Sequence, residues 1–217
     1  MEEPIIYPLY RSSSWSEAWA SNQFRSKAIG AVIIFITILL FLPHFFYIIE
    51  KRQGIVLNDW LLQSIPALDF SLTIFIFLWS TSLLIIIRSI QHPAIFLLSI
   101  FLLIVITLTR VVTISLFPLD PPLGLIHLID PLTSLTYGGT QVFITKDLFF
   151  SGHTSNLFMF YLCLQKKRDK QFALLATVMV GFLLLVQHVH YSIDVIAAII
   201  FTYGLVKLTK RLSFLTV

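Results

Sequence analysis

Charged residues are scarce in this sequence. Its 217 residues include 15 Lys and Arg and 11 Asp and Glu, so 12% are charged, against about a quarter in an ordinary soluble domain. Hydrophobic residues make up 57% of the chain, and the mean hydropathy is +0.89. This composition excludes a soluble globular domain, a disordered chain and a nucleic-acid binder with an exposed basic surface. The net charge of +4 is therefore interpreted as a signal of membrane orientation.

Cysteine pairs and a secretory signal peptide are also missing. Cys163 is the single cysteine, so an internal disulfide is excluded and the redox compartment cannot be inferred. The first 27 residues lack the basic start and short apolar core of a signal peptide. The segment Ser14-Trp15-Ser16-Glu17 has the form of a helix-capping box. It predicts either a short interfacial helix that carries Trp15 and Trp19, or a solvated tail.

Long charge-free runs predict an all-α, polytopic membrane protein. A spanning helix needs about 20 mostly apolar residues to cross ~30 Å of hydrocarbon. The last apolar run would form a helix of ~54 Å if unbroken, so we expect it to break near residues 187–190 and to form two antiparallel helices. The sequence thus predicts a bundle of six transmembrane helices within residues 28–209, between an interfacial segment (1–27) and a tail (210–217). The runs are 29–49, 70–87, 93–109 (resuming to 117), 148–165 and 171–206, the last with Asp194 as its one charge.

The basic residues predict the orientation of these six helices. Eleven Lys and Arg fall on the side shared by both termini, three fall on the other side, and Arg110 lies within or at the membrane. The positive-inside rule then places both termini in the cytoplasm. The long connection from residue 118 to about 150 would face outward.

Ionisable residues inside spans are costly, so they indicate function. One polar cluster, residues 147–154, opens the fourth predicted span with Asp147 and His153. A second, residues 188–195, opens the sixth with His190 and Asp194. Both helices start from the outer side in this topology, so we expect the two clusters to meet at one depth.

The spacing within these clusters predicts phosphoryl transfer. His190 and Asp194 are four residues apart and share a helix face, so the carboxylate can fix the imidazole tautomer and leave the other nitrogen free to attack. His153 lies among small residues at a helix start, where backbone amides and the helix dipole favour a phosphate. His153 could protonate a leaving alkoxide. The scheme needs no metal and no other cofactor.

These residues resemble a known family. Ser151-Gly152-His153 together with His190-x-x-x-Asp194 is similar to the type 2 phosphatidic acid phosphatase (PAP2) superfamily. The segments 147–154 and 190–195 look more like its sphingomyelin synthase branch, and Arg110-Val-Val-Thr-Ile resembles a third motif of that branch. The resemblance covers roughly residues 110–207. It implies that His190 is the nucleophile, Asp194 its partner and His153 the acid and base.

The departures from the family bear on the reaction. The phosphatase branch usually has a Pro where this chain has Phe150, and an Arg that residues 181–189 lack. The resemblance therefore favours transfer of phosphocholine or phosphoethanolamine from a glycerophospholipid donor to a lipid-alcohol acceptor, ceramide or diacylglycerol, at an exoplasmic site. A PAP2-type phosphatase is the main alternative, and a non-enzymatic membrane protein is another. A CDP-alcohol phosphotransferase would need an Asp cluster for Mg²⁺, which the sequence does not supply. The oligomeric state is not predicted.

The remaining polar residues keep alternative interpretations. Arg110 either holds a phosphate or anchors the helix at the interface, and Asp147 either caps the fourth helix or tunes His153. Tyr191 either contacts substrate or simply begins the sixth helix. His188 is interpreted as a supporting donor, an interfacial residue or half of a metal pair with His190, for which a spacing of two on a helix places the side chains ~200° apart. Further candidate phosphate ligands are Ser151, Gly152 and Thr154, while His44, His92 and His127 are interpreted as packed residues.

Overall fold

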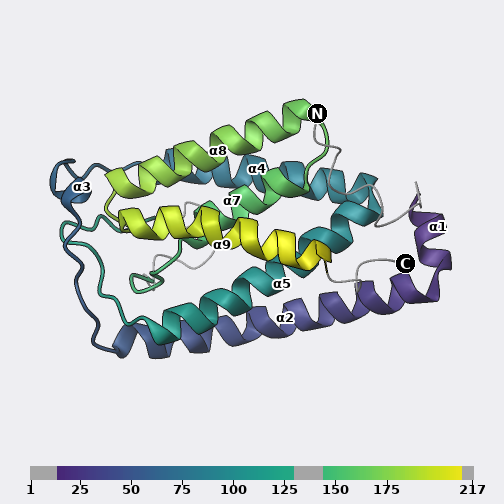
Figure 1. The fold of residues 1–217 in the computed structure, drawn as a ribbon, viewed down its shortest axis with the longest axis horizontal. Coiled ribbons are helices and arrows are strands. Elements are labelled where there is room, and N and C mark those ends of the chain that lie inside the picture. The colour runs from purple at the N-terminus through teal and green to yellow at the C-terminus, as the bar shows by residue number, and fades with distance from the viewer. Residues whose placement is uncertain (1–13, 130–143, 212–217) are drawn as a thin grey trace.

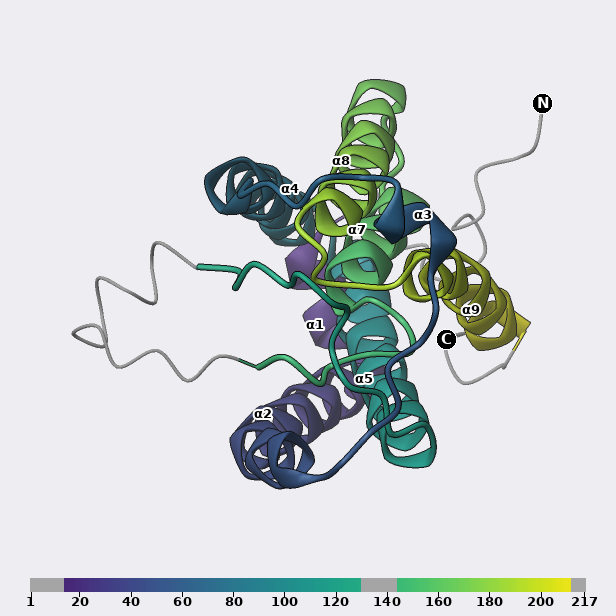
Figure 2. The ribbon, with the colours of Figure 1, turned by 90° about the vertical axis from the view of Figure 1, so that its left-hand side faces the viewer.

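The computed structural model describes residues 14–129 and 144–211. Within these ranges the chain is helical apart from its connections and one isolated β-bridge between Ile55 and Leu119. The long helices lie side by side and alternate in direction, so the connections gather at two ends of a bundle (Figure 1, Figure 2). The predicted all-α class is confirmed. The helices are α1 (Trp15–Ala20), α2 (Asn22–Lys51), α3 (Trp60–Gln63), α4 (Ser71–Gln91), α5 (Pro93–Leu116), α7 (Gly152–Cys163), α8 (Lys167–Val186) and α9 (Ser192–Arg211).

The N-terminal capping box forms the short helix that it predicts. The Ser14 hydroxyl accepts a hydrogen bond from the Glu17 amide at 3.3 Å and caps α1. The Trp15 indole donates to the Ile90 carbonyl at 2.7 Å, and its ring packs 5.4 Å from that of Phe96. These contacts tie α1 to the connection between α4 and α5.

Within the described ranges, five helices are long and apolar enough to cross a membrane: α2, α4, α5, α8 and α9. The predicted break in the run 171–206 is confirmed, because α8 ends at Val186 and α9 begins at Ser192. The predicted helix over 148–165 is wrong in length. It begins only at Gly152, and its 12 residues measure ~18 Å, less than the ~30 Å of hydrocarbon. Six spans therefore stay a prediction.

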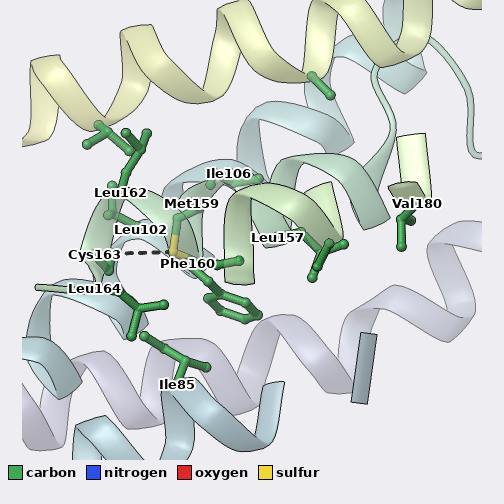
Figure 3. Close-up of a cluster of buried hydrophobic side chains, with 14 of the residues drawn as sticks. Ile85, Leu102, Ile106, Leu157, Met159, Phe160, Leu162, Cys163, Leu164 and Val180 are labelled. Atoms are coloured by element: carbon green, nitrogen blue, oxygen red, sulfur yellow. Dashed lines mark hydrogen bonds between the residues drawn. The ribbon is translucent and has the colours of Figure 1, made fainter. Parts of the chain in front are cut away.

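The short helix α7 lies at the centre of the bundle, packed against α4, α5, α8 and α9. Its side chains form much of the largest apolar cluster (Figure 3). Leu157, Met159 and Cys163 are fully buried there, and the Cys163 sulfur lies 3.6 Å from that of Met159. Phe150 and Ser151, just before the helix, are also fully buried. Neighbouring helices thus cover both α7 and the irregular backbone that precedes it, the setting in which such backbone is tolerated inside a membrane.

The two ends of the bundle differ in composition. At one end, called the basic end, Arg88 at the end of α4 pairs with Asp169 at the start of α8 at 2.6 Å. The basic residues 166–168 and 170 lie here. The opposite end, called the loop end, holds α3 and the connections after α2, α5 and α8 (Figure 1). That the basic end is cytoplasmic stays a prediction.

At the loop end, side-chain oxygens tie the connections to the helices. The Glu50 carboxylate, in the last turn of α2, accepts from the amides of Thr145 and Lys146 at 2.6 and 2.7 Å. The Ile55 amide donates to the Pro118 carbonyl at 2.9 Å. A Cβ at Gly54 would overlap the neighbouring backbone of Leu119, so this close approach requires glycine. The segment that leads into α7 is thereby anchored to α2.

Candidate active site

A buried His–Asp pair lies at the start of α9, with Asp194 in the first turn and His190 two residues before the helix. Nδ1 of His190 donates to Oδ2 of Asp194 at 3.1 Å, and the two side chains are 3% and 0% exposed. Asp194 also accepts from the Tyr191 amide at 3.0 Å and the Phe149 amide at 3.1 Å. Three donors compensate the buried carboxylate. They fix the tautomer in which Nε2 of His190 carries the lone pair.

The segment before α7 lies directly against this pair. The Ser151 amide donates to the Asp194 carbonyl at 3.1 Å, so the polar clusters at the starts of α7 and α9 meet, as predicted. Phe149 adopts φ 94°, a conformation that is strained for a bulky side chain. Its ring stacks on Phe117 at 4.1 Å. The hydrogen bond to Asp194 and this stack together hold the strained residue in place.

Ser151 and Thr154 point into the protein. The Ser151 hydroxyl accepts from the Thr154 amide at 3.3 Å and from the Thr154 hydroxyl at 3.2 Å. Ser151, and not Asp147, therefore caps α7. Both hydroxyls are fully buried and engaged in this capping. Their role as phosphate ligands stays a prediction.

Arg110, which lies near the end of α5, contacts the same segment from its other side. Its Nε donates to the Phe150 carbonyl at 3.3 Å, and its Nη2 forms an ion pair with Asp147. A Cβ on Gly152 would overlap the guanidinium, so only glycine allows arginine this close to the start of α7. Arg110 is thus held inside the protein instead of reaching out to the interface.

An open cavity of about 280 Å³ lies between α2, α5 and the start of α7. Its polar lining residues include Arg110, Asp147 and His153, together with Gly152. The His153 ring packs edge-on against that of Phe75 at 6.4 Å. His190 is not in this lining. Among the described residues, the predicted site therefore forms two groups, joined by the backbone of residues 149–151.

Tyr191 supports the loop end. Its hydroxyl donates to the Asp120 carbonyl at 2.8 Å and accepts from the Leu57 amide at 3.1 Å. Its side chain is 1% exposed, and this burial raises the pKa of Tyr191 above its ordinary value. These contacts connect the start of α9 to the two connections that follow α2 and α5. A contact between Tyr191 and substrate stays a prediction.

His188 also has contacts that link connections. Its Nδ1 lies 2.9 Å from the Leu123 carbonyl oxygen and its Nε2 lies 3.0 Å from that of Ile65. Its backbone has φ 55°. Both ring nitrogens therefore engage backbone carbonyls, as in the supporting role that the sequence left open. In the described part of the chain, no cluster of three His, Cys, Asp or Glu has metal-binding geometry.

Asp59 is an important residue that the sequence reasoning missed. Its carboxylate accepts from the Ser192 amide at 2.6 Å and the Ser192 hydroxyl at 3.1 Å, and it also caps α3. Burial favours a higher pKa, but the hydrogen bonds from Ser192 and α3 outweigh it and hold the pKa of Asp59 below its ordinary value. An Asp before Trp60-Leu-Leu is an N-cap signal for α3. No sequence pattern indicates its second contact, to the start of α9.

Comparison with known families identifies the C-terminal part of the chain. Residues 146–211 match the family "PAP2 superfamily C-terminal", a range that contains Asp147, His153, His190 and Asp194. This part of the chain is therefore similar to the PAP2 superfamily. No curated protein matches the chain. The matched domain and the apolar helices fit an integral-membrane lipid phosphatase or phosphotransferase.

Proposed function

On the premise of a PAP2 C-terminal domain, we propose that the protein is an integral-membrane lipid phosphotransferase of the sphingomyelin synthase type. It moves phosphocholine or phosphoethanolamine from a glycerophospholipid to ceramide or diacylglycerol through a phosphohistidine. The observation that carries this proposal is the buried His190–Asp194 pair, whose carboxylate has three donors and leaves Nε2 of the histidine as the nucleophilic atom.

In the first step, the donor places its phosphorus between the two groups of the site, where Nε2 of His190 attacks it. The bond between phosphorus and the diacylglycerol oxygen breaks, and His153 protonates the departing alkoxide. Asp194 stabilises the positive charge that develops on the imidazole. Arg110 stabilises the phosphoryl oxygens as negative charge shifts onto them.

In the second step, the acceptor alcohol resolves the phosphohistidine. His153, now neutral, takes the hydroxyl proton as the alcohol oxygen attacks phosphorus. The P–N bond breaks and its electron pair returns to Nε2 of His190. Both histidines are then in their starting states, and the reaction requires no other reactant.

The charge distribution supports an exoplasmic site. Basic residues gather at the end where α4 ends and α8 begins. Helices α7 and α9 begin toward the opposite end, the loop end (Figure 1). With the basic end in the cytoplasm, the candidate site opens toward the outer leaflet. Cysteine accessibility to an impermeant reagent, after a cysteine is placed at exposed Trp60, would test this orientation.

The deciding experiment supplies labelled phosphatidylcholine or phosphatidylethanolamine to the purified protein in mixed micelles, with and without ceramide or diacylglycerol. A new lipid that carries the labelled head group supports transfer. Free phosphate from phosphatidic acid, with no acceptor product, supports the phosphatase alternative. His190→Ala should abolish transfer, whereas His44→Ala should retain it, because His44 lies at an exposed position on α2 and is not packed as the sequence predicted.

A further inference from the structure

The cavity between α2 and α5 has two chemically distinct walls. The wall formed by α2 is entirely apolar, with Phe35, Leu39, Leu42, Phe45 and Phe46. The facing wall carries the Arg110–Asp147 pair with His153 and Asn156 from α7. The same facing side also has the apolar Leu103, Val111 and Ile114 of α5, and an apolar cavity with one charged patch suits a ligand that is itself amphipathic.

The length of the cavity and its opening match one acyl chain within one leaflet. Its α2 wall extends from residue 35 to 46, which is ~16 Å along the helix and about half of the ~30 Å hydrocarbon thickness. On α5 it extends from Arg110 to Leu103, ~10 Å further from the loop end. Leu39 lines the cavity and is nevertheless 47% exposed, so the cavity opens between the helices toward the surrounding bilayer.

The charges on the polar wall favour a zwitterionic head group. Arg110 and Asp147 form an ion pair, so together they have no net charge. Nη1 of Arg110 and Oδ2 of Asp147 have no hydrogen bond with any residue that the structure describes. The pair thus offers a free N–H to a phosphate and a free carboxylate oxygen to an ammonium group.

We propose that this cavity binds the donor phospholipid, with one acyl chain between α2 and α5 and a zwitterionic head group across the Arg110–Asp147 pair. The identification of the bound phospholipid as the donor rests on the proposed phosphotransferase function. Arg110 contacts the phosphate and Asp147 the ammonium, which makes Asp147 a residue that determines head-group specificity. The lipid enters sideways from the leaflet, so its acyl chain never leaves an apolar environment.

The acyl-chain part is tested by photolabelling. The full chain is reconstituted in phosphatidylglycerol nanodiscs that contain a trace of phosphatidylethanolamine with a diazirine in mid-chain, and labelled peptides are mapped after irradiation. Leu39→Trp should reduce labelling of residues 103–111 about tenfold, because the added bulk overpacks the site. Leu40→Trp is the matched control, since Leu40 is the next residue, is 77% exposed and does not line the cavity. Unchanged labelling in Leu39→Trp, or an equal loss in both variants, overturns the proposal.

The head-group part is tested by competition with unlabelled lipids in the same nanodiscs. Wild-type protein should lose its label to phosphatidylethanolamine or phosphatidylcholine far more readily than to phosphatidic acid. Asp147→Asn, which keeps an oxygen for Arg110, should reduce that preference about tenfold, and Asp147→Glu should restore part of it. A preference that survives in Asp147→Asn overturns this assignment.

These readouts separate the inference from the proposed function, because labelling requires no turnover. Labelling at the cavity without head-group transfer would support the lipid-binding site and contradict the proposed phosphotransferase function. Transfer by wild-type protein with labelling elsewhere would mean that the inference alone fails.

Discussion

The two groups of the candidate site differ in how their charged side chains are satisfied. In the His190–Asp194 group the carboxylate is fully buried and accepts three hydrogen bonds, two of them from backbone amides. In the Arg110–Asp147 group the side chains are 13% and 22% exposed and line an open cavity. The first group resembles a preorganised reaction centre, and the second resembles a binding surface with unused hydrogen-bonding capacity.

This difference predicts which of the two groups tolerates amino-acid substitution. A buried carboxylate with three donors cannot be altered without leaving donors unsatisfied. A partly exposed ion pair can exchange partners, because water or a ligand can replace one contact. Substitutions in the first group should therefore cause the largest losses of rate, and those in the second should cause smaller losses and also alter which lipid binds and how tightly.

Asp194→Asn should have the largest effect. The amide keeps the volume of the carboxylate but cannot accept from His190, Tyr191 and Phe149 together, so the imidazole loses its tautomer and charge partner. By analogy with His–Asp pairs in other enzymes, we expect the rate of head-group transfer to fall by ~10³–10⁴. Single-turnover assays at saturating donor would measure it.

Asp69→Asn is the matched control for this variant. Asp69 also lies at the loop end, where it accepts from the amide and hydroxyl of Ser71, but it has no contact with the site. Its substitution should lower stability and leave single-turnover rates within a few-fold. Equal rate losses in both variants would contradict the reaction-centre interpretation of Asp194.

Gly152→Ala should have the next largest effect. The added Cβ overlaps the Arg110 guanidinium, so Arg110 must leave the start of α7. Displacement of a substrate-positioning group by ~1 Å can cost roughly 10² in rate. Displacement of Arg110 should also weaken donor binding. Gly204→Ala is the control, because a Cβ there meets nothing within 4 Å. If KM rises as kcat falls in Gly152→Ala, Arg110 contributes to donor binding. If the kinetic constants equal those of the wild-type protein, Arg110 is not part of the site.

The sequence predicts the reaction-centre group better than the binding group. The four-residue spacing predicted the contact between His190 and Asp194, although His190 lies just before α9 and not on the helix that the prediction assumed. Arg110 and Asp147 are separated by 37 positions, and no local periodicity indicates that they pair. The start of α7 was missed because residues 148–151 are apolar enough to read as helix, although the strained Phe149 and the Ser151 cap delay the helix to Gly152.

Asp59→Asn should have a moderate effect, mainly on stability. Asparagine can keep the cap of α3 through its amide oxygen, but it loses the hydrogen bond from the Ser192 amide to Oδ2, and an unsatisfied buried donor of this kind costs ~1–3 kcal/mol. The pKa of Asp59 is held below its ordinary value of 3.8. Its stabilising contribution is therefore complete above that value and is lost as pH falls through the lower folded-state pKa. The unfolding midpoints of wild-type protein and Asp59→Asn in micelles should differ by a constant amount above pH 3.8 and converge as the pH falls below that value. If the difference between the two proteins does not change with pH, ionisation of Asp59 does not contribute to stability.

The smallest effect is expected far from both groups, at the basic end. Arg88 donates from two nitrogens to Asp169, at 2.6 and 3.2 Å, and lysine cannot reproduce this forked geometry. Arg88→Lys should shift the unfolding midpoint less than Asp59→Asn does, with kcat and KM unchanged, because the pair joins α4 to α8 at the opposite end from the site. A double-mutant cycle with Asp169→Asn measures their coupling. A change in donor preference in either single variant would show that head-group selection extends along the bundle, and the comparison drawn between two local groups would then fail.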